Sequence, residues 1–202
     1  MRLIEQHWQW TQKPENALEI IEYAGRTCYK SEEKITPGSA EKFARMLMKS
    51  GHESVMEHVN AGVRFITNRG VTHELVRHRL AAYSQESTRY VNYKNREMAF
   101  IKPVWWEEST DEQKECFLTA LKEAEAHYNH LIASGWKPQQ AREVLPNALK
   151  TEIVVTANLR QWRHIFTLRT AKAAHPQIIS LMRDCLEGFK AQIPVLFDNI
   201  LG

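Results

Sequence analysis

Cysteine is scarce in this chain, and long apolar segments are missing. Three cysteines occur among 202 residues, Cys28, Cys116 and Cys185, far apart and without a CxxC pair. We therefore expect neither a disulfide framework nor a cysteine-rich zinc site. No apolar run approaches the roughly 20 residues that cross a bilayer, and the N-terminal residues have no apolar segment typical of a signal peptide. These absences predict a cytoplasmic protein with no membrane contact.

The phosphate-binding glycine loops of common nucleotide-binding proteins are also absent. Neither GxGxxG nor GxxxxGK[ST] occurs, so a bound dinucleotide would be held without a Rossmann or P-loop cradle. The segment HELVRH resembles the zinc motif HExxH, but His73 and His78 are five residues apart and point about 140° from each other on a helix. We therefore predict no metal site.

The composition is that of a folded, globular protein. Hydrophobic residues make up 43% of the chain and charged residues 25%, a balance that excludes a disordered or fibrous class. The net charge of +3 is too small to favour nucleic acid by itself, whereas a local anion site fits it well. We expect one domain over residues 1–202 and no nucleic-acid partner.

Apolar periodicity predicts several helices and a few strands. Strands are expected at residues 2–10, 59–65 and 87–93, whereas residues 151–159 fit either a strand or the start of a helix. Helices are expected at about 14–28, 39–50, 72–83, 109–135, 138–146, 160–169 and from Pro176 onward. Strand and helix do not alternate regularly, which favours an α+β fold with an antiparallel-type sheet and surrounding helices.

Polar residues and glycines mark the expected helix ends. Ser39 and Thr72 are suitable N-caps, and Ser109 with Glu112 has the spacing of a capping box. Gly135 is expected to end the helix that follows Ser109. The apolar stripe of that helix runs from Cys116 to Ile132 and predicts its buried face.

The segment RHRLAAYSQESTRY, residues 77–90, concentrates positive charge and hydroxyl groups. On the expected helix, Arg77 and Arg79 point roughly 200° apart. Either Arg79 is a solvated surface charge or the helix lies between two anionic ligands, whose oxygens the planar guanidinium can grip in pairs. Ser87, Thr88 and Arg89 follow in a turn of a kind that offers N–H groups and hydroxyls to phosphate. A basic surface helix with a serine-rich turn is the alternative.

A second basic cluster lies at residues 157–169. Arg160 and His164 are four apart and share a helix face, while Arg169 falls roughly 140° from His164 and faces another side. Arg142 is an isolated cation before a Leu-Pro pair. Buried arginines need partners, and anionic ligands can supply them.

Together these segments resemble the flavin-dependent thymidylate synthases, whose motif is RHR, seven residues, then SxR. Here the motif reads Arg77-His78-Arg79, LAAYSQE, Ser87-Thr88-Arg89. The segments GHESVMEH, AREVLP and TANLRQWRHIFTLR resemble the family as well, so the resemblance covers about residues 50 to 175. It implies a non-Rossmann α+β fold and a homotetramer with active sites between subunits.

The resemblance also implies an activity. Such enzymes methylate dUMP at C5 to give dTMP, with methylenetetrahydrofolate as carbon donor, FAD as hydride carrier and NADPH as reductant. By position, the FAD-binding residues would be His52, Ser54, Arg77, His78, Arg79, Asn158, Leu159, Arg160 and His164. The dUMP-binding residues would be Glu74, Leu75, Val76, Arg77, Gln85, Glu86, Ser87, Thr88, Arg89, Arg142 and Arg169, with the 85–89 loop supplied by a neighbouring subunit.

No cysteine lies in these polar motifs, so uracil activation is expected to be electrostatic. Arg169 is the predicted catalytic residue, stabilising negative charge on the N3/O edge of the ring. One departure is Glu74, which stands where the family usually has Gln, because an ionised carboxylate there would repel dUMP unless it turns away, is protonated or pairs with an arginine. A nucleic-acid-binding module and a nucleotide-binding protein without catalysis are the competing hypotheses.

Overall fold

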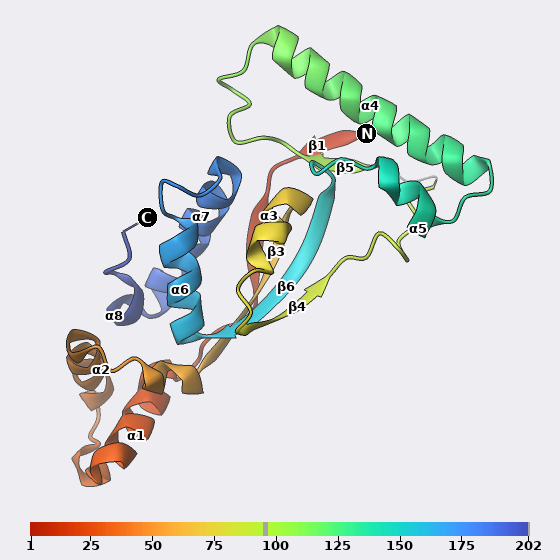
Figure 1. Ribbon diagram of the computed structural model, residues 1–202. Coiled ribbons are helices and arrows are strands. Elements are labelled where there is room, and N and C mark those ends of the chain that lie inside the picture. Colours follow the sequence, from red (N-terminus) through yellow and green to blue (C-terminus); the bar gives the residue numbers. More distant parts are fainter. Residues whose placement is uncertain (95–96, 202) are drawn as a thin grey trace. The chain divides into compact units, whose positions relative to one another are not determined.

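Helices and short strands follow one another irregularly along the chain (Figure 1). The computed structural model describes residues 1–94 and 97–201. Its strands are β1 (Arg2–Ile4), β2 (His7–Gln12), β3 (Asn60–Asn68), β4 (Ala81–Gln85), β5 (Ala99–Ile101) and β6 (Lys150–Asn158). Its α-helices are α1 (Ala17–Tyr29), α2 (Ser39–Ser50), α3 (Arg69–Leu75), α4 (Asp111–Ala133), α5 (Pro138–Ala141), α6 (Leu159–Arg169), α7 (Pro176–Gln192) and α8 (Pro194–Phe197), and 3₁₀ turns lie at η1 (Glu32–Lys34), η2 (Ser54–His58) and η3 (Arg142–Val144).

The strands form two sheets. Four of them lie in the order β2-β3-β6-β4 in an antiparallel sheet, and β1 pairs with β5 in parallel, with Leu3 opposite Phe100. The α+β prediction is therefore confirmed. Of the uncertain residues 151–159, all but Leu159 belong to strand β6, and Leu159 begins α6. Strand β3 is buried along most of its length because it is an inner strand, so the half-buried strand expected there was wrong.

The chain divides into two compact units. Residues 1–8, 64–77 and 83–154 form the first, here named the α4 unit, and residues 9–63, 78–82 and those from 155 onward form the second, the α6 unit. Strands β2, β3, β4 and β6 each contribute residues to both. The single domain over 1–202 stays a prediction. Within the described residues, no helix combines the length and apolarity needed to cross a membrane.

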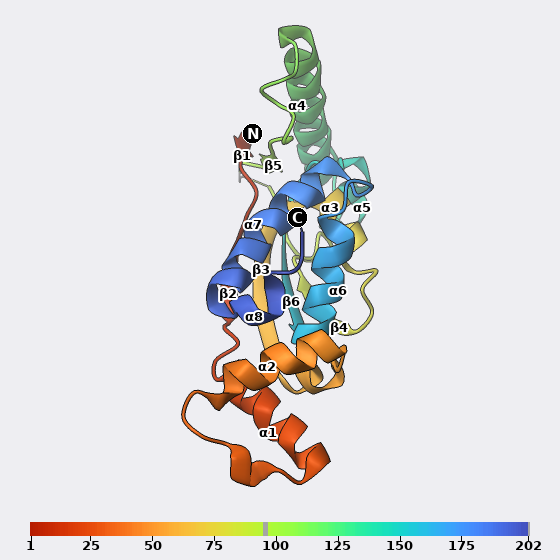
Figure 2. The ribbon, with the colours of Figure 1, turned by 90° about the vertical axis from the view of Figure 1, so that its left-hand side faces the viewer.

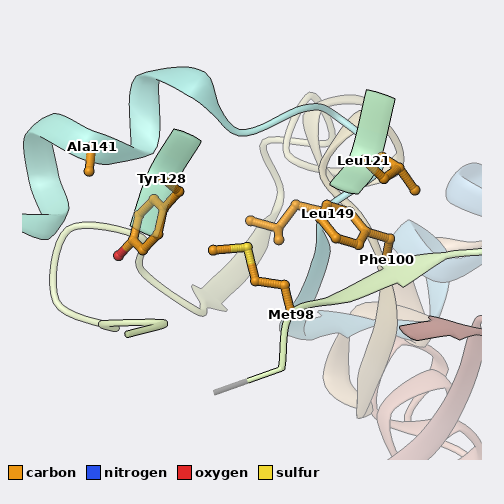
Figure 3. Packing of buried hydrophobic residues seen from close by; sticks show 6 residues of the cluster. All are labelled: Met98, Phe100, Leu121, Tyr128, Ala141 and Leu149. Carbon is orange, nitrogen blue, oxygen red and sulfur yellow. The ribbon is translucent and has the colours of Figure 1, made fainter. Parts of the chain in front are cut away.

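The core of the α4 unit packs one face of α4 against β5 and the residues before β6 (Figure 3). Leu121 and Tyr128, seven residues apart and hence on one helix face, are buried with Phe100 and Leu149. The expected stripe is confirmed at these positions, but Cys116 is exposed. The capping box uses Thr110 and Gln113, one residue later than expected.

The core of the α6 unit is aromatic. The ring centroids of Trp162 and Phe166 from α6 lie 5.0 Å each from that of Phe189 on α7, and the Trp10 centroid lies 4.6 Å from it. The indole N–H of Trp162 donates to the carbonyl of Ala61 in β3 at 3.0 Å. Side by side in Figure 2, α6 and α7 are in direct contact, and this packing fixes where the polar side of α6 points.

Three local predictions around the RHR segment were wrong. Helix α3 ends at Leu75 instead of continuing to Tyr83, because the Tyr83 hydroxyl donates to the Leu75 carbonyl at 2.8 Å and residues 81–85 join the sheet as β4. Helix α3 begins after Asn68, whose side chain accepts from the Val71 N–H, so Thr72 is not its cap. Residues 87–93 form no strand, because the N–H groups of Tyr90 and Val91 close a turn onto the Ser87 carbonyl.

Candidate functional site

Within the α6 unit, His78 of the RHR segment lies at the end of α6. The Nε of Arg169, the last residue of the helix, donates a hydrogen bond of 2.9 Å to Nε2 of His78. The rings of His78 and His164 meet edge to face with centroids 5.7 Å apart. The helical wheel separated His164 from Arg169, but both reach His78, since Arg169 is long and sits where the helix ends.

His78 is held as a neutral ring. Its side chain is buried, with a relative exposure of 5%. Burial, and then the positive charge of Arg169 and the neighbouring His164, lower the pKa of His78 to about 4. Because Nε2 accepts from Arg169, the ring proton lies on Nδ1.

A cavity of about 890 Å³ opens beside this arrangement in the α6 unit. Its lining joins η2, the residue after Arg79, and one side of α6; the residues are Glu53, Glu57, Leu80, Asn158, Arg160, Gln161, Arg163, His164 and Thr167. Three predicted FAD residues, Asn158, Arg160 and His164, therefore come together here. Asn158 also caps α6, because its side chain accepts from the Gln161 N–H at 2.8 Å.

Two arginines in this cavity are balanced by carboxylates. Arg160 Nη1 donates to Glu57 at 2.5 Å, and its Nε lies 3.7 Å from Glu53. Arg163 donates to the Leu196 carbonyl and to Asn199, and its buried Nε lies 3.6 Å from Glu53. Burial lowers the pKa of Arg163 from its ordinary value. Residue spacing did not single out Arg163, although its place three residues after Arg160 puts it on a neighbouring part of the helix surface.

A second cavity, of about 990 Å³, lies between α1, η1 and α2. It is lined by Arg26, Lys34, Lys42, Phe43 and His52, among others. The structure thus separates His52 from the cavity that holds Asn158, Arg160 and His164. Ser54 is exposed at the start of η2 and lines neither cavity.

The remaining predicted FAD residues differ in exposure. Arg77 and Arg79 are both exposed, in the turn between α3 and β4. The Leu159 side chain is fully buried, and its N–H donates to the Val59 carbonyl. Both groups are therefore engaged in contacts within the protein.

In the α4 unit, the turn from Ser87 to Val91 is organised by its own hydrogen bonds. Ser87 Oγ accepts from the N–H of Arg89 at 3.2 Å, and the guanidinium carbon of Arg89 lies 5.5 Å from the Tyr90 ring centre. Ser87 and Arg89 are accessible, whereas Thr88 is buried. The turn therefore presents a hydroxyl and a cation in a fixed arrangement.

Gln85 and Glu86, both predicted to hold dUMP, have partners within the α4 unit. The Gln85 amide donates to the hydroxyls of Thr72 and Thr151 at 2.9 and 3.2 Å. The Glu86 carboxylate accepts from Tyr93 at 2.9 Å and from Lys150 at 3.1 Å. These bonds anchor β4 and the start of the turn to α3 and β6.

The network continues to a half-buried carboxylate. Glu152 pairs with Lys150 and Arg64. Burial opposes ionisation of Glu152, but hydrogen bonds from Lys150 and Arg64 outweigh it, so its pKa is lowered. For Tyr93, burial and the charge of Glu86 raise the pKa, while the nearby Arg69 cation opposes that rise.

Arg69, at the start of α3, has a buried donor without a partner. Among the described residues, no atom accepts a hydrogen bond from its Nη1. Its backbone N–H donates at 3.0 Å to the carbonyl of Asn147, five residues after the half-buried Arg142. Neither composition nor spacing singled out Arg69, because a lone arginine between Asn and Gly reads as a turn residue.

The other predicted dUMP residues are divided between interior and surface. Leu75 is fully buried and its carbonyl is taken by Tyr83, whereas Val76 is 40% exposed. Glu74 is half-buried on α3. Arg169, half-buried, belongs to the α6 unit.

These arrangements define a class of α+β protein in which Arg, His and hydroxyl donors gather in local clusters within each unit or along one turn. Among the described residues, no three His, Cys, Asp or Glu side chains are grouped as metal ligands. The donor set suits an anionic organic ligand, since guanidinium and imidazole groups bind phosphate and carboxylate oxygens.

Comparison with known proteins identifies the family. Residues 9–195 match the family model described as thymidylate synthase complementing protein. A flavin-dependent thymidylate synthase of Corynebacterium glutamicum is 34% identical, covering 95% of this chain and 82% of that protein. That of Mycobacterium tuberculosis is 36% identical, covering 93% and 81%. A crystal structure of the UMP/dUMP methylase PolB from Streptomyces cacaoi with 5-Br dUMP superposes with a TM-score of 0.81 at 25% identity, covering 98% of this chain and 96% of that one. The chain belongs to the flavin-dependent thymidylate synthase family.

Proposed function

We propose that this protein catalyses the reductive methylation of dUMP to dTMP. Methylenetetrahydrofolate supplies the carbon, FAD carries the hydride and NADPH is the reductant. The enzyme acts as a cytoplasmic homotetramer with active sites at subunit interfaces. The observation that carries the proposal is the hydrogen bond between Arg169 and His78, because it joins the RHR motif to an arginine 91 residues away in sequence, in a chain that matches the family over nearly its whole length.

The cavity beside α6 has the properties that FAD requires. Its volume of about 890 Å³ is in the upper part of the range of ligand pockets. Arg160 and Arg163 offer N–H donors to phosphate oxygens, and His164 and Asn158 add polar contacts. Glu53 and Glu57 hold the two arginines in place before the ligand arrives. When bound, FAD would supply the hydride-transfer chemistry of the reaction.

Substrate binding is assigned to the accessible donors of the α4 unit and to Arg169. Ser87, Arg89 and Arg142 present hydroxyl and guanidinium groups suited to the phosphate of dUMP. Gln85 and Glu86 support the turn through their own hydrogen bonds. The family resemblance places this loop against the dUMP of a neighbouring subunit.

Arg169 activates the uracil ring. Carbon C5 of uracil is a weak nucleophile, and negative charge on the N3/O edge makes it more reactive. A fixed guanidinium at that edge stabilises the charge as it develops. A covalent thiol route has no support: Cys185 is fully buried and burial raises its thiol pKa, while Cys28 and Cys116 line neither of the two large cavities of the α6 unit.

The function is tested with the purified protein. A yellow flavin spectrum and tritium release from C5-labelled dUMP that requires both NADPH and methylenetetrahydrofolate are expected. Addition of dUMP should perturb the flavin absorbance, and light scattering should give the mass of four chains. A colourless protein that does not bind added FAD, and that releases no tritium under these conditions, would reject the proposal.

A further inference from the structure

The hydrogen bond from Arg169 to His78 has a consequence for catalysis. We propose that His78 is a positioning residue, which holds the Arg169 guanidinium in the orientation needed at the substrate by accepting from its Nε. This inference rests on the proposed function, in which Arg169 acts on uracil. The family resemblance had implied a different role for His78, contact with FAD.

The geometry favours positioning for three reasons. First, the ring of His78 is 5% exposed, and its Nε2 lies 2.9 Å from Arg169 Nε, which places the ring against protein groups. Second, the contact edge-on with His164 restricts rotation of the ring. Third, a guanidinium is planar, so a bond at Nε fixes the plane in which its terminal N–H groups point.

The bond works only while His78 is neutral. An imidazolium has no acceptor nitrogen and would repel the adjacent guanidinium. The groups that face the ring, Arg169 and His164 from α6, together with burial, keep it unprotonated at neutral pH. Uncharged His78 therefore supplies an acceptor without neutralising Arg169, whereas a carboxylate at this place would cancel the charge that the reaction uses.

The test compares kcat, KM and flavin content in His78 variants. His78→Ala is expected to lower kcat for tritium release 10- to 100-fold, because small misplacements of a catalytic group have effects of that order. Flavin absorbance and KM for dUMP should change little. His78→Gln should recover most of the activity, since its amide oxygen can occupy the place of Nε2. In an Arg169→Ala background, His78→Ala should have no further effect on kcat, because the two residues act as one unit.

A second readout does not depend on activity. The ¹⁵N–¹H signal of Arg169 Nε, assigned by its loss in Arg169→Lys, should be protected from exchange in the wild type, unprotected in His78→Ala and restored in His78→Gln. Loss of flavin in both His78 variants would overturn the proposal in favour of FAD contact. Unchanged kcat in His78→Ala, or equal additional losses in the Arg169→Ala background, would also overturn it. An inactive wild type with an intact Arg169 signal would instead reject the proposed function.

A separate observation, the unpartnered Nη1 of Arg69, carries a second inference. We infer that Arg69 donates to the substrate phosphate, again within the proposed function. A buried donor without an acceptor is rare and costly in a native protein, and a bound anion would supply the missing acceptor. The position of Arg69 supports this inference. Its backbone N–H is bonded to the segment that follows Arg142. Its positive charge acts on Tyr93, whose hydroxyl donates to Glu86, the residue before Ser87.

Arg69→Met separates a ligand role from a structural one. Removal of an unsatisfied donor should leave the thermal stability of the ligand-free protein unchanged or raised. KM for dUMP should rise about 10-fold or more, as expected for loss of a hydrogen bond to a charged group, and the rise in melting temperature on adding dUMP should shrink. Arg45→Met, at an exposed arginine on α2, is the control. An unchanged KM, or a less stable ligand-free protein with flavin and dUMP affinities lowered together, would overturn the inference.

Discussion

Replacing Arg169 with alanine is expected to lower kcat for tritium release from C5-labelled dUMP by about 10² to 10³-fold, the usual effect of removing one preorganised donor to a developing negative charge. Flavin binding should persist, because the cavity proposed for FAD is lined by Asn158, Arg160, Arg163 and His164 and does not include Arg169. The measurement is initial-rate kinetics at saturating dUMP, NADPH and methylenetetrahydrofolate, with the flavin content of each preparation determined from its spectrum.

Two further variants sharpen the Arg169 result. Arg169→Lys keeps the charge but loses the planar fork and the Nε donor to His78, so its kcat should lie between those of wild type and alanine. Arg45→Ala removes an exposed arginine that pairs with Glu41 on α2 and should leave turnover unchanged. If Arg169→Ala turns over at the wild-type rate, uracil activation is not its role.

The free energy of unfolding should fall as the pH is lowered from about 6.5 towards 4, and part of this fall should come from protonation of His78. The unfolded chain binds a proton at this residue near pH 6.5, whereas the folded protein does so only near pH 4. Between these values the unfolded state holds more protons, so acidification favours it. The difference in pKa corresponds to about 3 kcal/mol as an upper value, which is a large part of the stability of an ordinary domain.

Urea unfolding of wild type and His78→Gln at several pH values isolates this contribution. Carboxylates with a lowered pKa, such as Glu152, also lose stabilisation at acid pH, but they do so in both proteins and cancel in the difference. The stability of His78→Gln should therefore decline less steeply between pH 6.5 and 4. Parallel curves for the two proteins would show that His78 is not buried as a neutral ring.

Long periodic segments were predictable from the sequence, and element ends were not. Apolar residues three and four positions apart predict helices α4 and α7. Leu121, Tyr128 and Phe189 are buried, as that pattern requires. The start of α4 has two possible capping boxes, because Ser109 with Glu112 and Thr110 with Gln113 have the same spacing. Only Thr110 with Gln113 forms the capping box. Propensity cannot separate two candidates that differ by one residue.

The end of α3 shows a stronger limit. Residues 72–83 have a helical pattern, yet the chain leaves the helix at Leu75 because strand β4 pairs with β6 and Tyr83 caps the free carbonyl. Those partners lie eight or more residues away, outside any local pattern. The helical-wheel argument about Arg77 and Arg79 therefore does not apply, since both residues lie in a turn.

By itself, the sequence determined the family, the α+β class and the basic motifs, because residue types at fixed spacing persist in the linear chain. Tertiary structure alone decided that His78 is buried and neutral against Arg169, that Arg163 lines the cavity, and that Arg69 keeps a buried donor unsatisfied. The burial of a side chain, its hydrogen-bond partner and its protonation state depend on groups that folding brings together. No spacing rule predicts a contact between residues 91 positions apart, such as His78 and Arg169.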